Sequence, residues 1–109
     1  MRYRVAIAPA ASQDEEDILT YLVACEELPA AKVLAARFDR ALASLASFPG
    51  RGRIVPELRR HGIVAFREII VAPHRIVYRI AGKVVRVVAI VDGRRDLDDL
   101  LRARVHRNP

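Results

Sequence analysis

The feature that most constrains the fold is the run from Phe66 to Asp96, which holds three stretches rich in Val and Ile. Side chains branched at Cβ are stiff and suit a pleated surface, so these stretches predict strands. Ala72-Pro73 and Ala81-Gly82 separate them, and Asp92-Gly93 closes the third. Proline has no N–H for a strand ladder, and glycine permits a tight turn. Because the connections are too short for crossovers, the three strands should form an antiparallel meander.

The middle strand should present two different faces. Successive side chains of a strand point to opposite sides, and a small domain usually buries one side of its sheet. The predicted core face holds Ile76, Tyr78 and Ile80, and the opposite face holds Arg75, Val77 and Arg79.

Arginines gather around this sheet. Arg67 begins the preceding strand, and Arg94 and Arg95 follow the last one. They are either solvated surface charges or a patch that faces an anion. Their concentration favours the patch, because guanidinium groups suit bidentate contacts with phosphate or carboxylate. The predicted target-binding or anion-binding residues are therefore Arg67, Arg75, Arg79, Arg94 and Arg95.

The first quarter of the chain predicts a strand followed by a helix. Residues 2–8 alternate between apolar and other side chains, and Pro9 suits the first position of a helix. Ser12 and Glu15 have the spacing of a capping box, so the helix should begin between residues 9 and 13. The acidic run 14–17 is explained by the positive end of the helix dipole rather than by a metal site. The buried stripe should consist of Ala11, Ile18, Leu22 and Cys25, flanked by Tyr21.

The following segments complete the predicted architecture. Residues 30–48 carry apolar side chains at helical spacing, so two helices should form an antiparallel hairpin on the sheet. The basic connector 49–63 has three glycines and is expected to be irregular, either a solvated loop or an extension of the anion patch. Asp96 is a plausible N-cap of a short final helix. We predict an α+β fold in a single domain, residues 1–109. An N-terminal strand and a three-stranded meander form a twisted antiparallel sheet, covered by the helical hairpin.

Composition limits the partners and the compartment. Residues 51–109 hold fourteen basic and six acidic residues, whereas the first half is slightly acidic. A basic half predicts an acidic partner, either nucleic acid or a carboxylate-rich protein. The single cysteine, Cys25, excludes an internal disulfide and is expected to be a small buried residue. With no signal peptide and no apolar run near the length of a membrane span, a cytoplasmic protein with no membrane contact is expected.

Several motifs, taken in order, resemble the RelE/ParE superfamily of toxins from bacterial toxin–antitoxin operons. The similarity covers nearly the whole chain. The strongest motifs are Arg67-Glu68-Ile69, then residues 74–80 (His-Arg-Ile-Val-Tyr-Arg-Ile), then residues 93–97 (Gly-Arg-Arg-Asp-Leu). Supporting motifs are Ala-Pro-Ala-Ala at residues 8–11 and Val-Pro-Glu-Leu at residues 55–58.

The resemblance implies a partner and a surface for it. A toxin of this kind is neutralised by a cognate antitoxin, whose segment is often acidic and poorly ordered when free, in a toxin–antitoxin hetero-oligomer. No cofactor and no metal are implied. The antitoxin-binding residues are predicted to be Ile18, Leu22, Leu34, Phe38, Arg75 and Arg79.

The superfamily has two principal activities, and they need different residues. RelE-type toxins are ribosome-dependent mRNA endoribonucleases, whose site needs proton-transfer groups and cations. Arg67, Arg75 and Arg95 fall on cationic positions of that site. Ile69 falls on its second lysine and Leu101 near its tyrosine, and neither can transfer a proton.

The missing groups favour the ParE type, a poison of DNA gyrase with no expected catalytic residue. His74 or His61 could substitute as a proton-transfer group, because histidine titrates near neutral pH. The alternative is therefore a RelE-type nuclease that uses Arg67, Arg75 and Arg95 on the ribosome and its mRNA. A third possibility is a basic nucleic-acid-binding domain without toxicity, which would bind DNA or RNA in a salt-dependent way.

Overall fold

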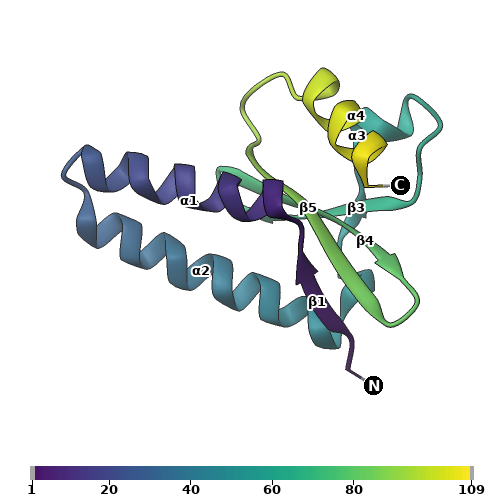
Figure 1. Ribbon diagram of the computed structural model, residues 1–109, viewed down its shortest axis with the longest axis horizontal. Coiled ribbons are helices and arrows are strands. Elements are labelled where there is room, and N and C mark those ends of the chain that lie inside the picture. The colour runs from purple at the N-terminus through teal and green to yellow at the C-terminus, as the bar shows by residue number, and fades with distance from the viewer. Residues whose placement is uncertain (1, 109) are drawn as a thin grey trace.

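The computed structural model describes residues 2–108 (Figure 1). In chain order the elements are β1 (Arg4–Ile7), α1 (Pro9–Ala24), α2 (Leu28–Ser47), the 3₁₀ helix η1 (Pro49–Arg51), β2 (Arg53–Ile54), α3 (Pro56–Arg59), β3 (Phe66–Val71), β4 (His74–Ala81), β5 (Val84–Asp92) and α4 (Asp98–Arg107).

The strands form one five-stranded sheet in the order β1-β5-β4-β3-β2. The predicted α+β class and the antiparallel meander of β3, β4 and β5 are confirmed. β1 joins the edge of the sheet parallel to β5, so the sheet is mixed rather than wholly antiparallel. The helical hairpin carries the chain from β1 at one edge to β2 at the other, and the meander returns β5 to the side of β1. The connector 49–63 is not irregular as expected: it forms η1, the short edge strand β2 and α3.

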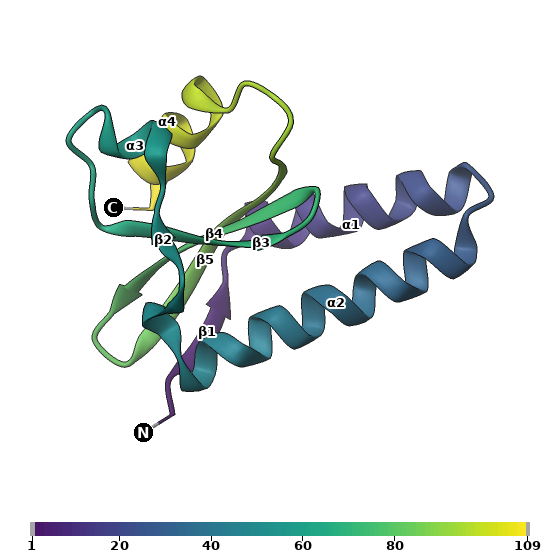
Figure 2. The same cartoon turned by 180° about the vertical axis from the view of Figure 1, so that it is seen from behind.

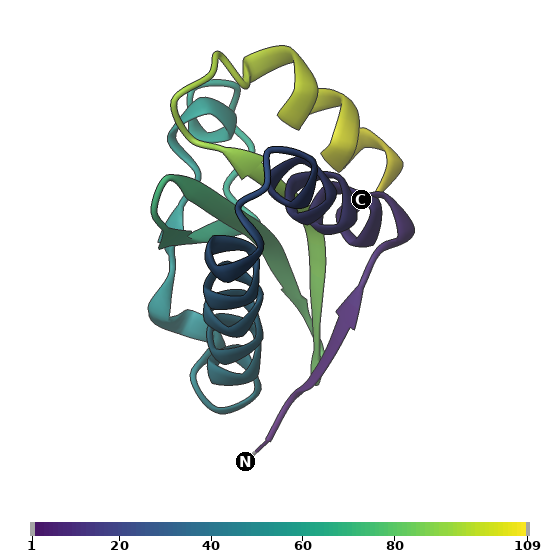
Figure 3. The same ribbon diagram turned by 90° about the vertical axis from the view of Figure 1, so that its left-hand side faces the viewer.

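The α1–α2 hairpin covers one face of the sheet (Figures 1 and 3). Leu45 and Phe38 of α2 are fully buried there against Ile76 and Tyr78 of β4, as the alternation of β4 predicts. The far ends of both helices extend past the sheet (Figure 1). Cys25, at the end of α1, is therefore exposed rather than buried as expected.

The opposite face, here called the outer face, is also partly buried. The short helices α3 and α4 lie over it (Figure 2) and bury Leu58 and Leu101 against Val77 of β4. Burying a leucine removes apolar area from water and contributes about 1.5–3 kcal/mol. The expectation of one core face and one open face is thus wrong for β4, because two short segments supply a second layer.

α1 starts within the expected range, at Pro9, but its cap differs from the expected one. The helix begins at Pro9, directly after Ala8, and the Ser12 N–H already donates to the Ala8 carbonyl at 3.0 Å. Ser12 therefore lies inside the first turn and caps nothing, so the predicted Ser12–Glu15 capping box is wrong. The acidic run 14–17 starts after the first turn, beyond most of the effect of the helix dipole.

Asp14 instead links three elements. Its carboxylate accepts the Ile90 N–H of β5 at 3.0 Å and binds both terminal nitrogens of Arg104 of α4 at 2.8 Å. Arg104 also donates to the Val88 carbonyl at 2.8 Å. The Ile90 N–H and the Val88 carbonyl lie just beyond Val87, the last residue of β5 that pairs with β1. The pair thereby satisfies the backbone of β5 where its neighbouring strand has ended.

Tyr78 ties the sheet to the connector. Its hydroxyl donates to the Pro49 carbonyl at 2.6 Å and accepts the Gly52 N–H at 3.0 Å. A Cβ at Gly52 would lie 2.5 Å from the same oxygen, so only glycine fits there without displacement. Because Tyr78 is completely buried, both backbone groups depend on this hydroxyl.

We expect Tyr78→Phe to lower the free energy of unfolding by about 1–3 kcal/mol, since it leaves a buried donor and acceptor without a partner. Urea denaturation measures the change. The matched control is Tyr21→Phe, because Tyr21 is 68% exposed and should tolerate the same loss. Equal stability of the two variants would contradict this role of Tyr78.

Candidate partner-binding groove

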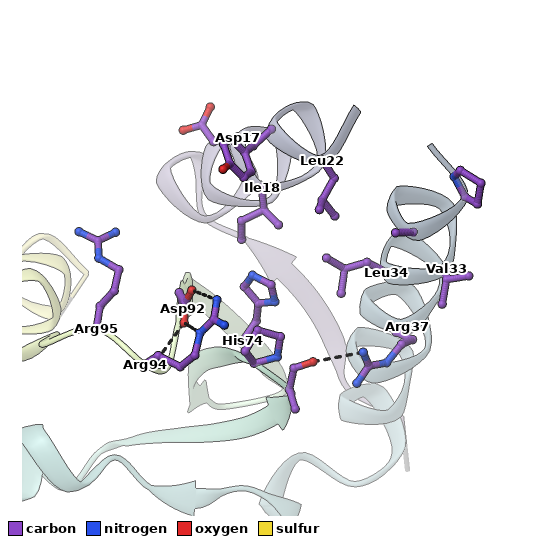
Figure 4. A pocket seen from close by; sticks show the side chains of 15 residues that line it. Asp17, Ile18, Leu22, Val33, Leu34, Arg37, His74, Asp92, Arg94 and Arg95 are labelled. Atoms are coloured by element: carbon purple, nitrogen blue, oxygen red, sulfur yellow. Dashed lines mark hydrogen bonds and ion pairs between the residues drawn. The ribbon is translucent and has the colours of Figure 1, made fainter. Parts of the chain in front are cut away.

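A groove with a volume of about 790 Å³ lies between the α1–α2 hairpin, the β3–β4 turn and the end of β5 (Figure 4). Its lining is Asp17, Ile18, Tyr21, Leu22, Pro29, Ala30, Val33, Leu34, Arg37, Ala72, Pro73, His74, Asp92, Arg94 and Arg95. Apolar side chains of the two helices face a rim that carries three arginines.

Of the antitoxin-binding residues predicted on the two helices, three line the groove and one is buried beneath it. Ile18, Leu22 and Leu34 line the groove together. Phe38 is completely buried, and its ring makes a T-shaped contact with the His74 ring at a centroid distance of 5.5 Å. Phe38 therefore supports the groove and is not accessible to a partner. Val33, 61% exposed on the groove wall, was missed because its side chain lies outside the buried stripe that the periodicity detects.

Of the three arginines on the rim of the groove, two bind other groups of the chain and one is exposed at the margin. Arg94 donates to both carboxylate oxygens of Asp92, at 3.0 and 2.7 Å. These hydrogen bonds hold the pKa of Asp92 well below its usual range. Arg37 of α2 donates to the Ala72 carbonyl at 3.2 Å, and Arg95 is exposed at the margin (Figure 4). Arg37 was also missed, although it lies one helical turn after Leu34.

The two histidines considered for proton transfer lie in different surroundings. His74 lines the groove, and burial lowers its pKa, which favours the neutral ring at neutral pH. Among residues 2–108 its Nδ1 has no hydrogen-bond partner. His61 is exposed and lies 3.0 Å from a carboxylate oxygen of Asp98, outside the groove.

The alternation of side chains along β4 predicted that Arg75 would face a partner. The structure instead buries it in ion pairs within the protein. It is 7% exposed, and its Nε donates to Glu68 at 2.7 Å. Both terminal nitrogens donate to Glu57 of α3 at 2.7 Å. The same Glu68 also accepts from Arg53 at 2.7 Å. Because α3 brings Glu57 over the sheet, the guanidinium is already occupied.

The arginines expected to form one patch are dispersed. Arg67 is the register partner of Tyr78, so it points to the face that α1 and α2 cover, and it donates to the Gly52 carbonyl at 2.7 Å. Arg79 points to the outer face and stacks on the Phe66 ring at 5.5 Å. Of the predicted set, only Arg94 and Arg95 line the groove.

The two positions that a RelE-type nuclease would need for proton transfer are apolar and buried. Ile69 is 4% exposed in the core under the hairpin, and Leu101 is fully buried in the core of the outer face. Within residues 2–108, no three His, Cys, Asp or Glu side chains are grouped as a metal site would require. Over the same range, no helix has the length and apolar character of a membrane span.

The fold is similar to that of chains in solved toxin–antitoxin systems. One similar structure is the chromosomal ParDE system from P. aeruginosa, with a TM-score of 0.66, 15% identity, and coverage of 84% of this chain and 96% of that chain. Another is the toxin–antitoxin complex RelBE2 from Mycobacterium tuberculosis, with a TM-score of 0.60, 21% identity, and coverage of 84% and 99%. A search of curated protein sequences gives no match.

A match between the sequence of this domain and a known family identifies the family. Residues 5–97 match the family described as the ParE toxin of the type II toxin–antitoxin system parDE. The chain belongs to this ParE toxin family, within the RelE/ParE superfamily that the motifs indicate.

We expect Glu57→Gln to destabilise the fold by about 1.5–3 kcal/mol at neutral pH, because Arg75 loses charged hydrogen bonds. The Arg75 hydrogen bonds lower the pKa of Glu57 from 4.5 to about 2. A lowered folded-state pKa contributes stability above pH 4.5 that is lost as the pH falls towards 2. The difference between wild type and variant should therefore shrink across that interval.

Urea denaturation at several pH values measures this difference. Glu16→Gln is the control, because Glu16 is exposed and has no ion pair within residues 2–108. A Glu57→Gln deficit that stayed constant from pH 6 to pH 2 would contradict the role of the Arg75–Glu57 pair.

Proposed function

We propose that this ParE-family toxin is a poison of DNA gyrase. The observation that carries the proposal is the match of residues 5–97 to the ParE toxin family. The site geometry supports it, because Ile69 and Leu101 are buried apolar residues where a nuclease needs proton-transfer groups. Arg75, a cationic position of the nuclease, is held by two carboxylates and is not free to stabilise a phosphorane.

The contact with gyrase is assigned to the exposed arginines after β5. Arg94 and Arg95 follow the last strand at the surface, beside the groove. Arg94 is already paired with Asp92, so Arg95 is the cation with more freedom to meet a carboxylate-rich partner. Arg67 and Arg79 of the predicted set are engaged with Gly52 and Phe66, and they contribute less directly.

We expect the purified toxin to inhibit supercoiling by gyrase and to accumulate cleaved DNA complexes. Arg95→Glu should weaken this inhibition about tenfold, a change of about 1.4 kcal/mol, because it reverses a contact charge. Arg40→Glu, on the exposed side of α2, is the matched charge reversal and should leave inhibition unchanged. The absence of inhibition, together with A-site mRNA cuts in toeprinting on ribosomes, would establish the nuclease instead.

We further propose that the groove binds a cognate antitoxin. The similar structures are described as ParDE and RelBE2 systems, and the latter as a toxin–antitoxin complex. The apolar wall of Ile18, Leu22 and Leu34 fits the apolar face of an amphipathic helix. The Arg37 and Arg95 side chains at the rim suit acidic side chains on the same segment.

A charge placed on the groove wall should abolish antitoxin binding. Val33→Asp puts a carboxylate on an exposed position of the wall and should weaken antitoxin binding by about a hundredfold or more, roughly 2.7 kcal/mol. Calorimetry with the antitoxin encoded beside the toxin gene measures the affinity. Val64→Asp, at a similarly exposed valine outside the groove, is the control. Equal affinity of the Val33→Asp variant would remove the groove from the interface.

A further inference from the structure

One end of the outer sheet face is not covered by a helix. α3 and α4 pack with Phe66 of β3, Val77 of β4 and residues 88, 89 and 91 of β5, and Asn108 just after α4 accepts from Arg86. The tip of the β4–β5 hairpin lies away from both short helices (Figures 1 and 2). This uncovered end includes the N-terminal part of β5, which pairs with β1.

The strand register gathers three arginines on this uncovered end. Arg79 of β4 is the direct partner of Arg86 of β5, and Arg86 is the partner of Ala6 of β1. Arg4 precedes Ala6 by two residues and so shares its face. In an antiparallel pair such as Arg79 and Arg86, directly opposed side chains have Cβ atoms about 4.5–5.5 Å apart. Arg4, Arg79 and Arg86, here called the arginine row, therefore cross three adjacent strands.

No acidic side chain within the described residues 2–108 pairs with the arginine row. The hydrogen bond of Arg86 goes to the neutral side chain of Asn108 at 3.3 Å. The Nε of Arg79 is buried without a partner in the same range. Like charges directly opposite each other destabilise a sheet. An anion that bridged Arg79 and Arg86 would remove this repulsion.

We propose that the arginine row binds the phosphate backbone of double-stranded DNA. Guanidinium groups match phosphate geometry and carry no base specificity when they contact the backbone. Single-stranded nucleic acids are held mainly by stacking on aromatic rings. On this face Phe66 is 3% exposed and lies under Arg79, so no ring is available for stacking. The surface is separate from the groove, and the proposal does not depend on gyrase as the target.

The test is the salt dependence of binding to a short fluorescein-labelled DNA duplex, followed by anisotropy. Each neutralised phosphate contributes about 0.9 to the slope of log affinity against log salt. The double variant Arg4→Gln/Arg86→Gln should therefore lower the slope by roughly 1.8. Both side chains are exposed, and removing one of two opposed charges should leave the melting temperature unchanged or raise it.

The matched control is Lys32→Gln/Arg40→Gln, which removes the same charge from exposed positions on α2, across the sheet. It should keep the slope of the wild type. The proposal is overturned if the duplex does not bind at about 50 mM salt, or if both double variants lower the slope equally. It is also overturned if a single-stranded oligonucleotide or a polyglutamate peptide binds more tightly through the same arginines. Gyrase inhibition can fail while duplex binding holds, so the two proposals are separable.

Discussion

Burial of the centre of β4, residues 75–78, on both faces is the constraint on which the rest of the structure depends. A charged or hydroxyl group in such a strand must find partners inside the protein, because leaving it unpaired costs several kcal/mol. Arg75 finds Glu57 and Glu68, and the Tyr78 hydroxyl finds the backbone of the connector. Because these partners include the segment 49–57, the connector and the central strand hold each other in place.

The fold was predictable where its signal is local. Period-two alternation revealed the strands, and the helical spacing of Leu34 and Phe38 revealed the hairpin. The second core was not predictable, because Leu58 and Leu101 lie in short segments with too few residues to show a period. The capping motif at Ser12 was misleading because Pro9 had already started the helix.

The sequence pointed to three apolar residues of the candidate groove and to two of its three arginines, but it indicated neither Arg37 nor the internal pairing of Arg75. Ile18 and Leu22 meet Leu34 across the hairpin because helical periodicity places them on facing stripes. Whether an arginine is available to a partner depends on whether a carboxylate distant in sequence packs against it. Glu57, eighteen residues before Arg75, does so. The register, not the composition, therefore separates internal arginines from those that remain available for a partner.

The Asp14–Arg104 pair has a consequence for how this protein can associate. An edge with free N–H and C=O groups recruits foreign strands, through peptide augmentation or through aggregation. Along β5 beyond Val87, a carboxylate from α1 binds the Ile90 N–H and a guanidinium from α4 binds the Val88 carbonyl. No incoming strand can be added along this stretch without displacing both side chains. A partner that approaches this side must be recognised through side chains rather than through main-chain ladders.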